Sequence, residues 1–447
     1  MTSDERIIAA DKGHVWHPYT AMDQYIAHTT PLVVQRAQGS RLYDSSGRGY
    51  LDGNSSWWVA PLGHAHPRLI ARLHAQADSL CHASLAGITH EPGALLAEEL
   101  TAIAPKGLSR VFYSDDGTTA VEVALKMALQ YWAQNGRPER RRFVALEGAF
   151  HGETLAVTSL GGIEVFRRPF GGVLIDCLRV PPGKDGERTA FDALCTLLAE
   201  HQNEIAGVIV EPMLQGAAGM RVYGAQYLKR VREVTREHDL LLICDEVFTG
   251  YGRTGPMWAS EYADIAPDLM CLAKGFSGGI LPMAATLASE RVFAGFNGGK
   301  QRAFLHGHSY CGHPLGAAIA REVLAIYREE KVLEQAQPKA AKIANHFQQL
   351  TQLPGVTDAR SLGMMGALTL MGDGSTGSPR AASQSSWQAG YLAEAGWRVY
   401  DEALKRGAYL RPIGNIVYIA PPLNIPDPDL DELLGILEES LKAVLGR

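Results

Sequence analysis

The chain has 447 residues, of which 46% are hydrophobic and 20% are charged, and its formal net charge is -6. This length allows a large buried core and predicts about two or three domains. The net negative charge leaves no broad basic surface, which argues against a nucleic-acid partner. Six cysteines without a C-x-x-C pair argue against a disulfide framework and a zinc site, and they suit a reducing cytoplasm.

The first residues give no sign of export. Residues 1–13 contain acids and a lysine where a signal peptide carries an apolar stretch. Nowhere does an apolar run approach the roughly 18 residues of a membrane span. We therefore expect a soluble, cytoplasmic protein with no membrane partner.

Short apolar runs alternate with helical patterns between about residues 110 and 290. Nearly continuous apolar runs are typical of strands that are covered on both faces. Such runs predict strands at 111–114, 142–146, 206–210, 240–244 and 269–272. The clearest helical pattern covers 118–134, where apolar residues recur at helical spacing. The pattern predicts an α/β fold with a mostly parallel, doubly wound sheet.

The pattern changes after about residue 330. It predicts a helix at 332–350, a strand at 365–371, a Gly/Ser/Pro-rich surface loop at 372–386, a strand pair around 409–419 and a last helix at 429–445. These elements indicate a smaller α+β domain. We predict an N-terminal segment at 1–75 that joins the small domain or contacts a partner, a large domain at 76–330 and the small domain at 331–447.

Ligands of open α/β sheets bind outside the carboxyl ends of the strands. The first predicted strand leads to Gly117 and Thr118 at a helix N-terminus, where free N–H groups and the helix dipole favour a phosphate. The alternative is simple N-capping by Thr118. Phe150 follows the second strand, where it can stack on a flat heteroaromatic ring or belong to the core. Glu211 follows the third strand and adds a carboxylate to the same edge.

The next two strands end in opposite charges. Asp245 follows an apolar run, and a buried carboxylate needs a cationic partner such as a pyridinium N–H. Lys274 follows the fifth strand, and buried lysines suit Schiff-base chemistry because their pKa values shift readily. A structural salt bridge is the alternative for Lys274. Taken together, these strand ends predict a coenzyme site.

Two further motifs have weaker support. Residues 250–255 match G-x-G-x-x-G, but they lie late in the predicted sheet and are followed by Pro256, so a dinucleotide-binding dehydrogenase is disfavoured. His64 and His66 form an H-x-H pair without a third ligand, and we interpret them as turn or helix-capping residues. We therefore predict no metal.

The strand ends and their neighbours resemble the subgroup III (ω-amino-acid) aminotransferases of fold type I over nearly the whole chain. The matching stretches are 117–118, 148–152, 243–247, 250–255, 272–275, 307–309 and 312–315. The resemblance implies a pyridoxal 5′-phosphate cofactor, with Lys274 as its Schiff-base lysine and Asp245 on its ring nitrogen, and a ping-pong reaction. It also implies a homodimer with shared sites, in which Ser309 reaches the phosphate bound by the other subunit. The implied cofactor contacts are Gly117, Thr118, Phe150, Asp245, Lys274, His308 and Ser309.

Stretches 16–20, 55–58, 121–132 and 411–418 are similar to one branch of the family. That branch converts 8-amino-7-oxononanoate to 7,8-diaminononanoate in biotin biosynthesis, with S-adenosylmethionine or lysine as amino donor, and we favour S-adenosylmethionine. The resemblance implies that Arg411 meets a substrate carboxylate. The implied substrate contacts are Tyr19, Trp57, Trp58, Phe150, Gly307, Arg411 and Tyr418.

Other interpretations stay open. Trp57 and Trp58 can instead pack at a dimer interface, and Arg411 can form a surface ion pair. The sequence departs from the branch at Phe150, where Tyr is usual, and at His308-Ser309, where Pro-Thr is expected. These departures keep open the alternative that the protein is a broad ω-amino acid or amine:pyruvate aminotransferase. A non-catalytic cofactor-binding protein is disfavoured because the lysine, the aspartate and the phosphate turn are all present.

Overall fold

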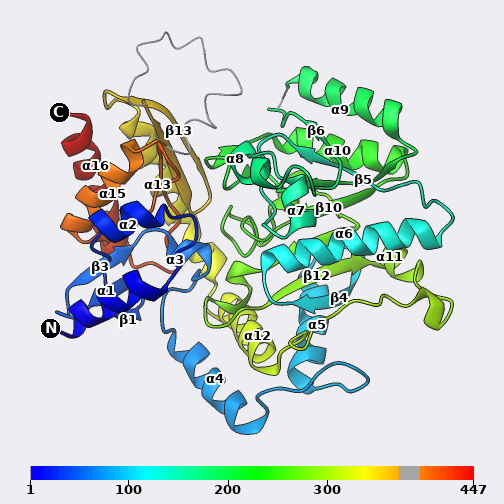
Figure 1. Ribbon diagram of the computed structural model, residues 1–447, viewed down its shortest axis with the longest axis horizontal. Coiled ribbons are helices and arrows are strands. Elements are labelled where there is room, and N and C mark those ends of the chain that lie inside the picture. The colour runs from blue at the N-terminus through cyan, green and yellow to red at the C-terminus, as the bar shows by residue number, and fades with distance from the viewer. Residues whose placement is uncertain (1, 185, 372–392, 447) are drawn as a thin grey trace.

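A computed structural model describes residues 2–184, 186–371 and 393–446 of the chain. The surface loop predicted at 372–386 lies outside these residues. The N- and C-terminal segments lie together on one side of the molecule, beside the large sheet (Figure 1). No helix in the described part of the chain is long and apolar enough to cross a bilayer.

The main sheet has seven strands and is parallel except for one. Its order is β4 (Leu108–Ser114), β12 (Ala284–Ser289), β11 (Leu269–Leu272), β10 (Leu241–Asp245), β7 (Ile205–Val210), β5 (Arg142–Leu146) and β6 (Cys177–Val180). Only β12 is antiparallel to its neighbours. The five predicted strands and the α/β fold are confirmed, whereas β6 and β12 were not predicted.

Helices cover this sheet, and Figure 1 shows α6 lying across one face of it. Helix α6 (Gly117–Gln134) begins after β4, and its buried residues recur at helical spacing, which confirms the helix predicted there. The other helices of this part are α5 (Glu91–Ile103), α7 (Leu155–Leu160), α8 (Glu164–Arg167), α9 (Arg188–His201), α10 (Ala225–Glu237), α11 (Glu290–Ala294) and α12 (Pro314–Glu329). Short 3-10 helices are η1 (Arg168–Phe170), η2 (Ala259–Ala263), η3 (Lys274–Ser277) and η4 (Lys300–Arg302), and a small ribbon pairs β8 (Leu214–Gln215) with β9 (Arg221–Val222).

Two smaller sheets combine the two ends of the chain. One has the order β1 (Val34–Gln38), β2 (Arg41–Asp44), β3 (Gly49–Asp52) and β15 (Ala408–Tyr409), and the other has β13 (Val356–Leu362), β14 (Met365–Leu370) and β16 (Ile416–Ile419). The remaining helices are α1 (Ser3–His14), α2 (Met22–His28), α3 (Ser55–Trp58), α4 (Pro67–Ser79), α13 (Val332–Leu350), α15 (Ala395–Arg406) and α16 (Asp427–Leu445). The predicted helix at 332–350 is confirmed, and the last helix begins two residues earlier than predicted.

Two strands are present around 409–419 as predicted, but they do not pair with each other. Strand β15 pairs in parallel with β3, while β16 pairs antiparallel with β14. Pro412 lies between the two strands and has no backbone N–H to donate to a ladder. Each strand completes a different sheet, and β15 ties residues 408–409 to the N-terminal segment.

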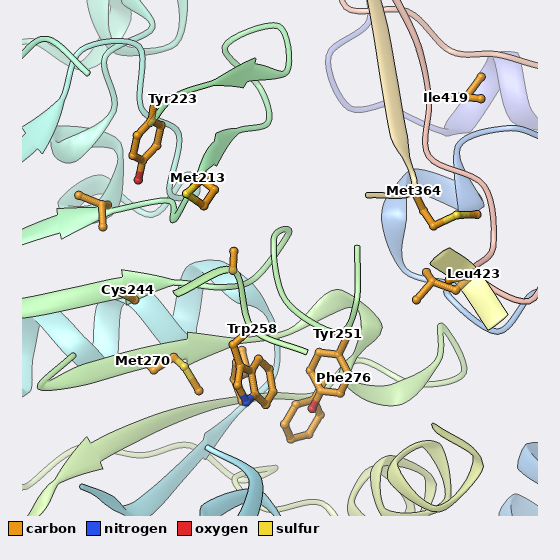
Figure 2. Close-up of a cluster of buried hydrophobic side chains, with 14 of the residues drawn as sticks. Met213, Tyr223, Cys244, Tyr251, Trp258, Met270, Phe276, Met364, Ile419 and Leu423 are labelled. Atoms are coloured by element: carbon orange, nitrogen blue, oxygen red, sulfur yellow. The ribbon is translucent and has the colours of Figure 1, made fainter. Parts of the chain in front are cut away.

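The loop with the G-x-G-x-x-G match joins the large sheet to the C-terminal part. Figure 2 shows Tyr251 beside Phe276 and Trp258, with Met364 and Leu423 on neighbouring C-terminal segments. The buried Arg253 guanidinium donates to the backbone oxygens of Met364 and Pro421 at 3.2 and 2.7 Å. The loop leads into η2 and opens no long helix, so it packs the two parts together and lacks the context of a dinucleotide site.

Candidate active site

A cavity of about 470 Å³ lies where the parallel strands of the main sheet end. It is lined from the turn after β4, the segments after β5 and β7, the ends of β10 and β11, and the segment after α3. Of the residues predicted for the site, the cavity lining includes Trp58, Gly117, Thr118, Phe150, Asp245 and Lys274. The sheet thus brings together residues that are far apart in the sequence.

Lys274 lines this cavity two residues after the end of β11, and its side chain is partly buried. Its backbone is left-handed (φ 51°), a conformation that costs free energy for a residue with a side chain and that is concentrated at functional sites. Burial lowers the pKa of the Lys274 ammonium group, although Asp245 and Glu211 act in the opposite direction. The amine Nζ lies 4.9 Å from the centroid of the Trp58 ring. The low polarity of these surroundings therefore disfavours the charged form of the amine.

Asp245 is the last residue of β10, the strand next to β11. Its carboxylate is paired with His151, whose Nδ1 lies 2.7 Å from Oδ2, and it accepts the Val247 backbone N–H at 3.1 Å. The His151 side chain is fully buried, and its Nε2 has no hydrogen-bond partner among the described residues. We gave His151 no role from the sequence, although its position after β5 and next to Phe150 offered the signal.

Glu211 is a second buried carboxylate at the cavity. Its two oxygens accept the backbone N–H groups of Phe150 and Gly216 at 3.1 and 2.9 Å. Burial raises the pKa of Glu211 to about 7, with His151 lowering it and Asp245 raising it. The sequence placed Glu211 at this edge, but we did not include it among the site residues.

The N-terminus of α6 opens onto the same cavity. Asp116 caps this helix by accepting the Thr119 backbone N–H, so the alternative in which Thr118 is the cap is wrong. The first four N–H groups of a helix have no partner within it, and Asp116 uses only the one from Thr119. A Cβ added to Gly117 would lie 2.5 Å from Val247 Cγ1, so only glycine fits between the helix and that side chain. The turn keeps backbone donors and the Thr118 hydroxyl at the cavity wall.

Aromatic residues and Arg411 cluster around Trp58, and we call this cluster the outer end; of its members only Trp58 belongs to the cavity lining. The Arg411 guanidinium carbon lies 4.3 Å from the Trp57 ring centroid, and the Tyr19 ring lies 5.5 Å from Trp57. Trp58 donates its indole N–H to the Tyr418 hydroxyl at 3.1 Å. All five residues predicted for this end are therefore close to one another.

Three other predicted residues and the histidine pair belong to neither the cavity lining nor the outer end. The cavity lining of this single chain does not include Gly307, His308 or Ser309, although His308 Nδ1 lies 3.5 Å from the carboxylate of Asp115, which does line it. His64 pairs with Asp52 at 2.8 Å. His66 is the N-cap residue of α4.

Comparisons with known proteins place the chain in a family. The family model for class-III aminotransferases matches residues 24–441, and the chain belongs to this family. An adenosylmethionine-8-amino-7-oxononanoate aminotransferase from Geobacter sulfurreducens is 39% identical over 98% of this chain and 97% of its own length. The relative of that name from Aquifex aeolicus is 37% identical, over 97% and 96%.

Solved structures show the same likeness. The crystal structure of the relative with that name from Methanocaldococcus jannaschii superposes with a TM-score of 0.92, at 35% identity over 99% of both chains. An amine transaminase from an uncultivated Pseudomonas species, solved in a PLP-bound form, gives a TM-score of 0.87 at 33% identity, over 97% of this chain and 98% of its own. The predicted fold type I is confirmed by these neighbours.

Proposed function

We propose that the chain binds pyridoxal 5′-phosphate in this cavity and converts 8-amino-7-oxononanoate to 7,8-diaminononanoate in biotin biosynthesis, with S-adenosylmethionine as amino donor. The observation that carries the proposal is the pair at the ends of β10 and β11. An amine whose pKa is lowered by its partly buried setting lines the same cavity as a buried, hydrogen-bonded carboxylate. The names of the relatives support the choice of substrate.

The residues at the cavity fit such a cofactor. The start of α6 offers backbone N–H groups and the Thr118 hydroxyl to a phosphate. Phe150 and Val247 both line the cavity and offer apolar contacts to a flat ring. Asp245 offers a carboxylate to a cationic ring nitrogen, and His151 and the Val247 N–H keep that carboxylate hydrogen-bonded. When bound, the cofactor supplies a reactive carbonyl and an electron sink for the carbanion formed in transamination.

The residues of this chain then provide orientation and proton transfer. The Lys274 amine, whose pKa is lowered by burial, is the nucleophile that holds the cofactor and the base that moves the proton at the substrate carbon. Trp58 and Phe248, with ring centroids 4.9 and 5.8 Å from Nζ, give the amine an apolar wall. His151 fixes the Asp245 carboxylate in place.

Substrate recognition falls to the outer end of the site. Arg411 presents a planar guanidinium for a carboxylate, and it lies over the Trp57 ring. The rings of Tyr19 and Trp57 provide an apolar surface for an aliphatic chain between that carboxylate and the reacting carbon. A keto acid with a long chain, such as 8-amino-7-oxononanoate, matches this arrangement.

A second candidate is a broad ω-amino acid or amine:pyruvate aminotransferase. Phe150 supports it, because stacking on the cofactor is retained while the hydroxyl contact of the usual Tyr is lost. The PLP-bound amine transaminase with a TM-score of 0.87 is consistent with it.

We further propose a cytoplasmic homodimer in which Gly307, His308 and Ser309 serve the partner's cavity. These residues do not line the cavity of their own chain. The apolar side chains of Leu305 and Tyr310 flank them and are 86% and 55% exposed, as expected for residues that a second subunit covers.

A half-reaction assay tests the proposed function. Protein loaded with pyridoxal 5′-phosphate is mixed separately with S-adenosylmethionine, lysine and putrescine, and the cofactor absorbance is followed. 8-Amino-7-oxononanoate is then added, and 7,8-diaminononanoate is measured by mass spectrometry. We expect S-adenosylmethionine to change the spectrum and to support product formation. If only putrescine changes the absorbance and no 7,8-diaminononanoate is formed, the second candidate is favoured.

Two lysine variants test whether Lys274 is the lysine that binds the cofactor. Lys274→Ala should abolish turnover and the absorbance of the lysine-bound cofactor. Lys339→Ala is the matched control because Lys339 is also largely buried and has a lowered pKa, but donates to the backbone oxygen of Leu423 away from the cavity. Turnover that survives in Lys274→Ala refutes the assignment.

A further inference from the structure

The two tryptophans of the site stand on a left-handed turn. Four consecutive residues of α3, none of them glycine, have positive φ: Ser55 at 47°, Ser56 at 46°, Trp57 at 65° and Trp58 at 77°. L-residues avoid this region because Cβ approaches the next carbonyl oxygen, so such a turn persists only when its surroundings hold it. The structure therefore has to supply specific contacts to this segment.

Asp52 supplies the largest set of these contacts. Its side chain is fully buried, and Oδ2 accepts the Ser56 N–H at 2.7 Å and the Ser56 hydroxyl at 2.9 Å. The same oxygen pairs with His64 Nε2 at 2.8 Å, while Oδ1 accepts the Asn54 N–H at 3.2 Å. Hydrogen bonds to a charged acceptor are about twice as strong as neutral ones.

The turn is also tied to the segments that carry Arg411 and Tyr418. Asn54 accepts the Arg411 N–H through Oδ1 at 2.7 Å and donates through Nδ2 to the Tyr418 oxygen at 3.3 Å. The Ser55 hydroxyl donates to the Ala420 oxygen at 2.7 Å. The left-handed turn and the substrate-binding end of the site thus form one hydrogen-bonded unit.

The hand of the turn decides where Trp57 lies. Successive side chains of a helical turn are rotated by about 100°, and a left-handed turn rotates them in the opposite sense. Trp58 is fixed by Tyr418 and lies over Lys274. With Trp58 held there, the left-handed turn places Trp57 against Arg411.

We propose that Asp52 is a positioning residue that determines substrate specificity. By holding the left-handed turn, it sets Trp57 and Arg411 at a defined separation from Lys274, and so selects the length of the substrate between its carboxylate and its reacting carbon. This inference rests on the proposed function for the identity of the substrate, but not for the role of Asp52 in the turn.

The test compares Asp52→Asn with a matched control and a rescue variant. Asp44→Asn is the control. Like Asp52, Asp44 accepts both the N–H and the hydroxyl of one serine, Ser46, but this pair lies in the exposed turn between β2 and β3. The rescue variant adds Ser56→Gly to Asp52→Asn, because glycine adopts the left-handed conformation without a steric cost.

Steady-state kinetics and near-UV circular dichroism are measured for each variant. We expect Asp52→Asn to raise KM for 8-amino-7-oxononanoate by about tenfold to a hundredfold and to change kcat much less, since the lost interactions hold the substrate end. Ser56→Gly should recover at least about threefold of the loss in KM. Asp44→Asn should match the wild-type protein. An unchanged KM in Asp52→Asn, or an equal rise in Asp44→Asn, overturns the proposal.

Circular dichroism separates this proposal from the substrate assignment. Near-UV spectra of the cofactor-free protein sum over all aromatic side chains, including the seven tryptophans, and need no substrate. If Asp52 sets Trp57 and Trp58, the spectrum should change in Asp52→Asn and return in the rescue variant. If 8-amino-7-oxononanoate is not a substrate of the wild-type protein, KM is measured for the keto acid that it does accept. If Asp52→Asn is recovered unfolded, Ser56→Ala takes its place. This variant removes only the hydroxyl that donates to Asp52 at 2.9 Å, and it should produce smaller changes of the same kind in KM and in the spectrum. Unchanged spectra in a folded variant contradict the role of Asp52.

Discussion

Replacing His151 by phenylalanine removes the side chain that pairs with Asp245 while keeping a ring in its buried place. The hydrogen bond that is lost joins Nδ1 to Oδ2 over 2.7 Å, and the His151 side chain is fully buried. A hydrogen bond to a charged group contributes about 1.5–3 kcal/mol, and about 1.4 kcal/mol corresponds to a factor of ten. His151→Phe should therefore weaken cofactor binding or slow proton transfer by about tenfold to a hundredfold.

The assay titrates cofactor-free protein with pyridoxal 5′-phosphate by absorbance and then measures single-turnover rates with the amino donor. His151→Gln, whose amide can still donate to Asp245, should lie between the wild-type protein and His151→Phe. His346→Gln is the control, because His346 lies 3.8 Å from Glu438, away from the cavity, and should leave both quantities unchanged. If the Kd and the rate of His151→Phe stay within about twofold of the wild-type values, Asp245 does not depend on His151.

Three further outcomes follow from the site. Gly117→Ala would place a methyl group 2.5 Å from Val247 Cγ1, and overpacking of this kind costs about 1–3 kcal/mol. The Kd for pyridoxal 5′-phosphate should therefore rise about tenfold or more in the same titration. Burial raises the pKa of Glu211 from 4.5 to about 7. The protonated Glu211 therefore contributes fully to the free energy of unfolding below pH 4.5, and this contribution, at most about 3 kcal/mol, is lost as the pH rises through 7. The stability of cofactor-free Glu211→Gln should depend less on pH between 5 and 8, and unfolding curves that run parallel to the wild-type ones would contradict this. Arg411→Ala should raise KM about tenfold to a hundredfold for keto acids but leave amines without a carboxylate unaffected, and equal effects on both classes would remove Arg411 from substrate binding.

The sequence by itself determined the parts of the protein that depend on local pattern. Apolar runs located the five strands 111–114, 142–146, 206–210, 240–244 and 269–272, because burial on both faces excludes polar residues along their length. Since parallel strands end at one edge of a sheet, the residues after those runs had to meet there. Lys274 and Asp245 were found in this way, as charged residues next to apolar strands.

Only the tertiary structure decided the features that depend on distant contacts. The strands β15 and β16 pair with residues 51–52 and 366–369, which are far from them in the sequence, so local pattern suggested a pair that does not exist. His151 shows its importance only where it meets Asp245, 94 residues further along the chain. The left-handed turn at Ser55–Trp58 contradicts the local preference of its own residues. It exists because Asp52, and the segments that carry Arg411 and Tyr418, hold it in that form.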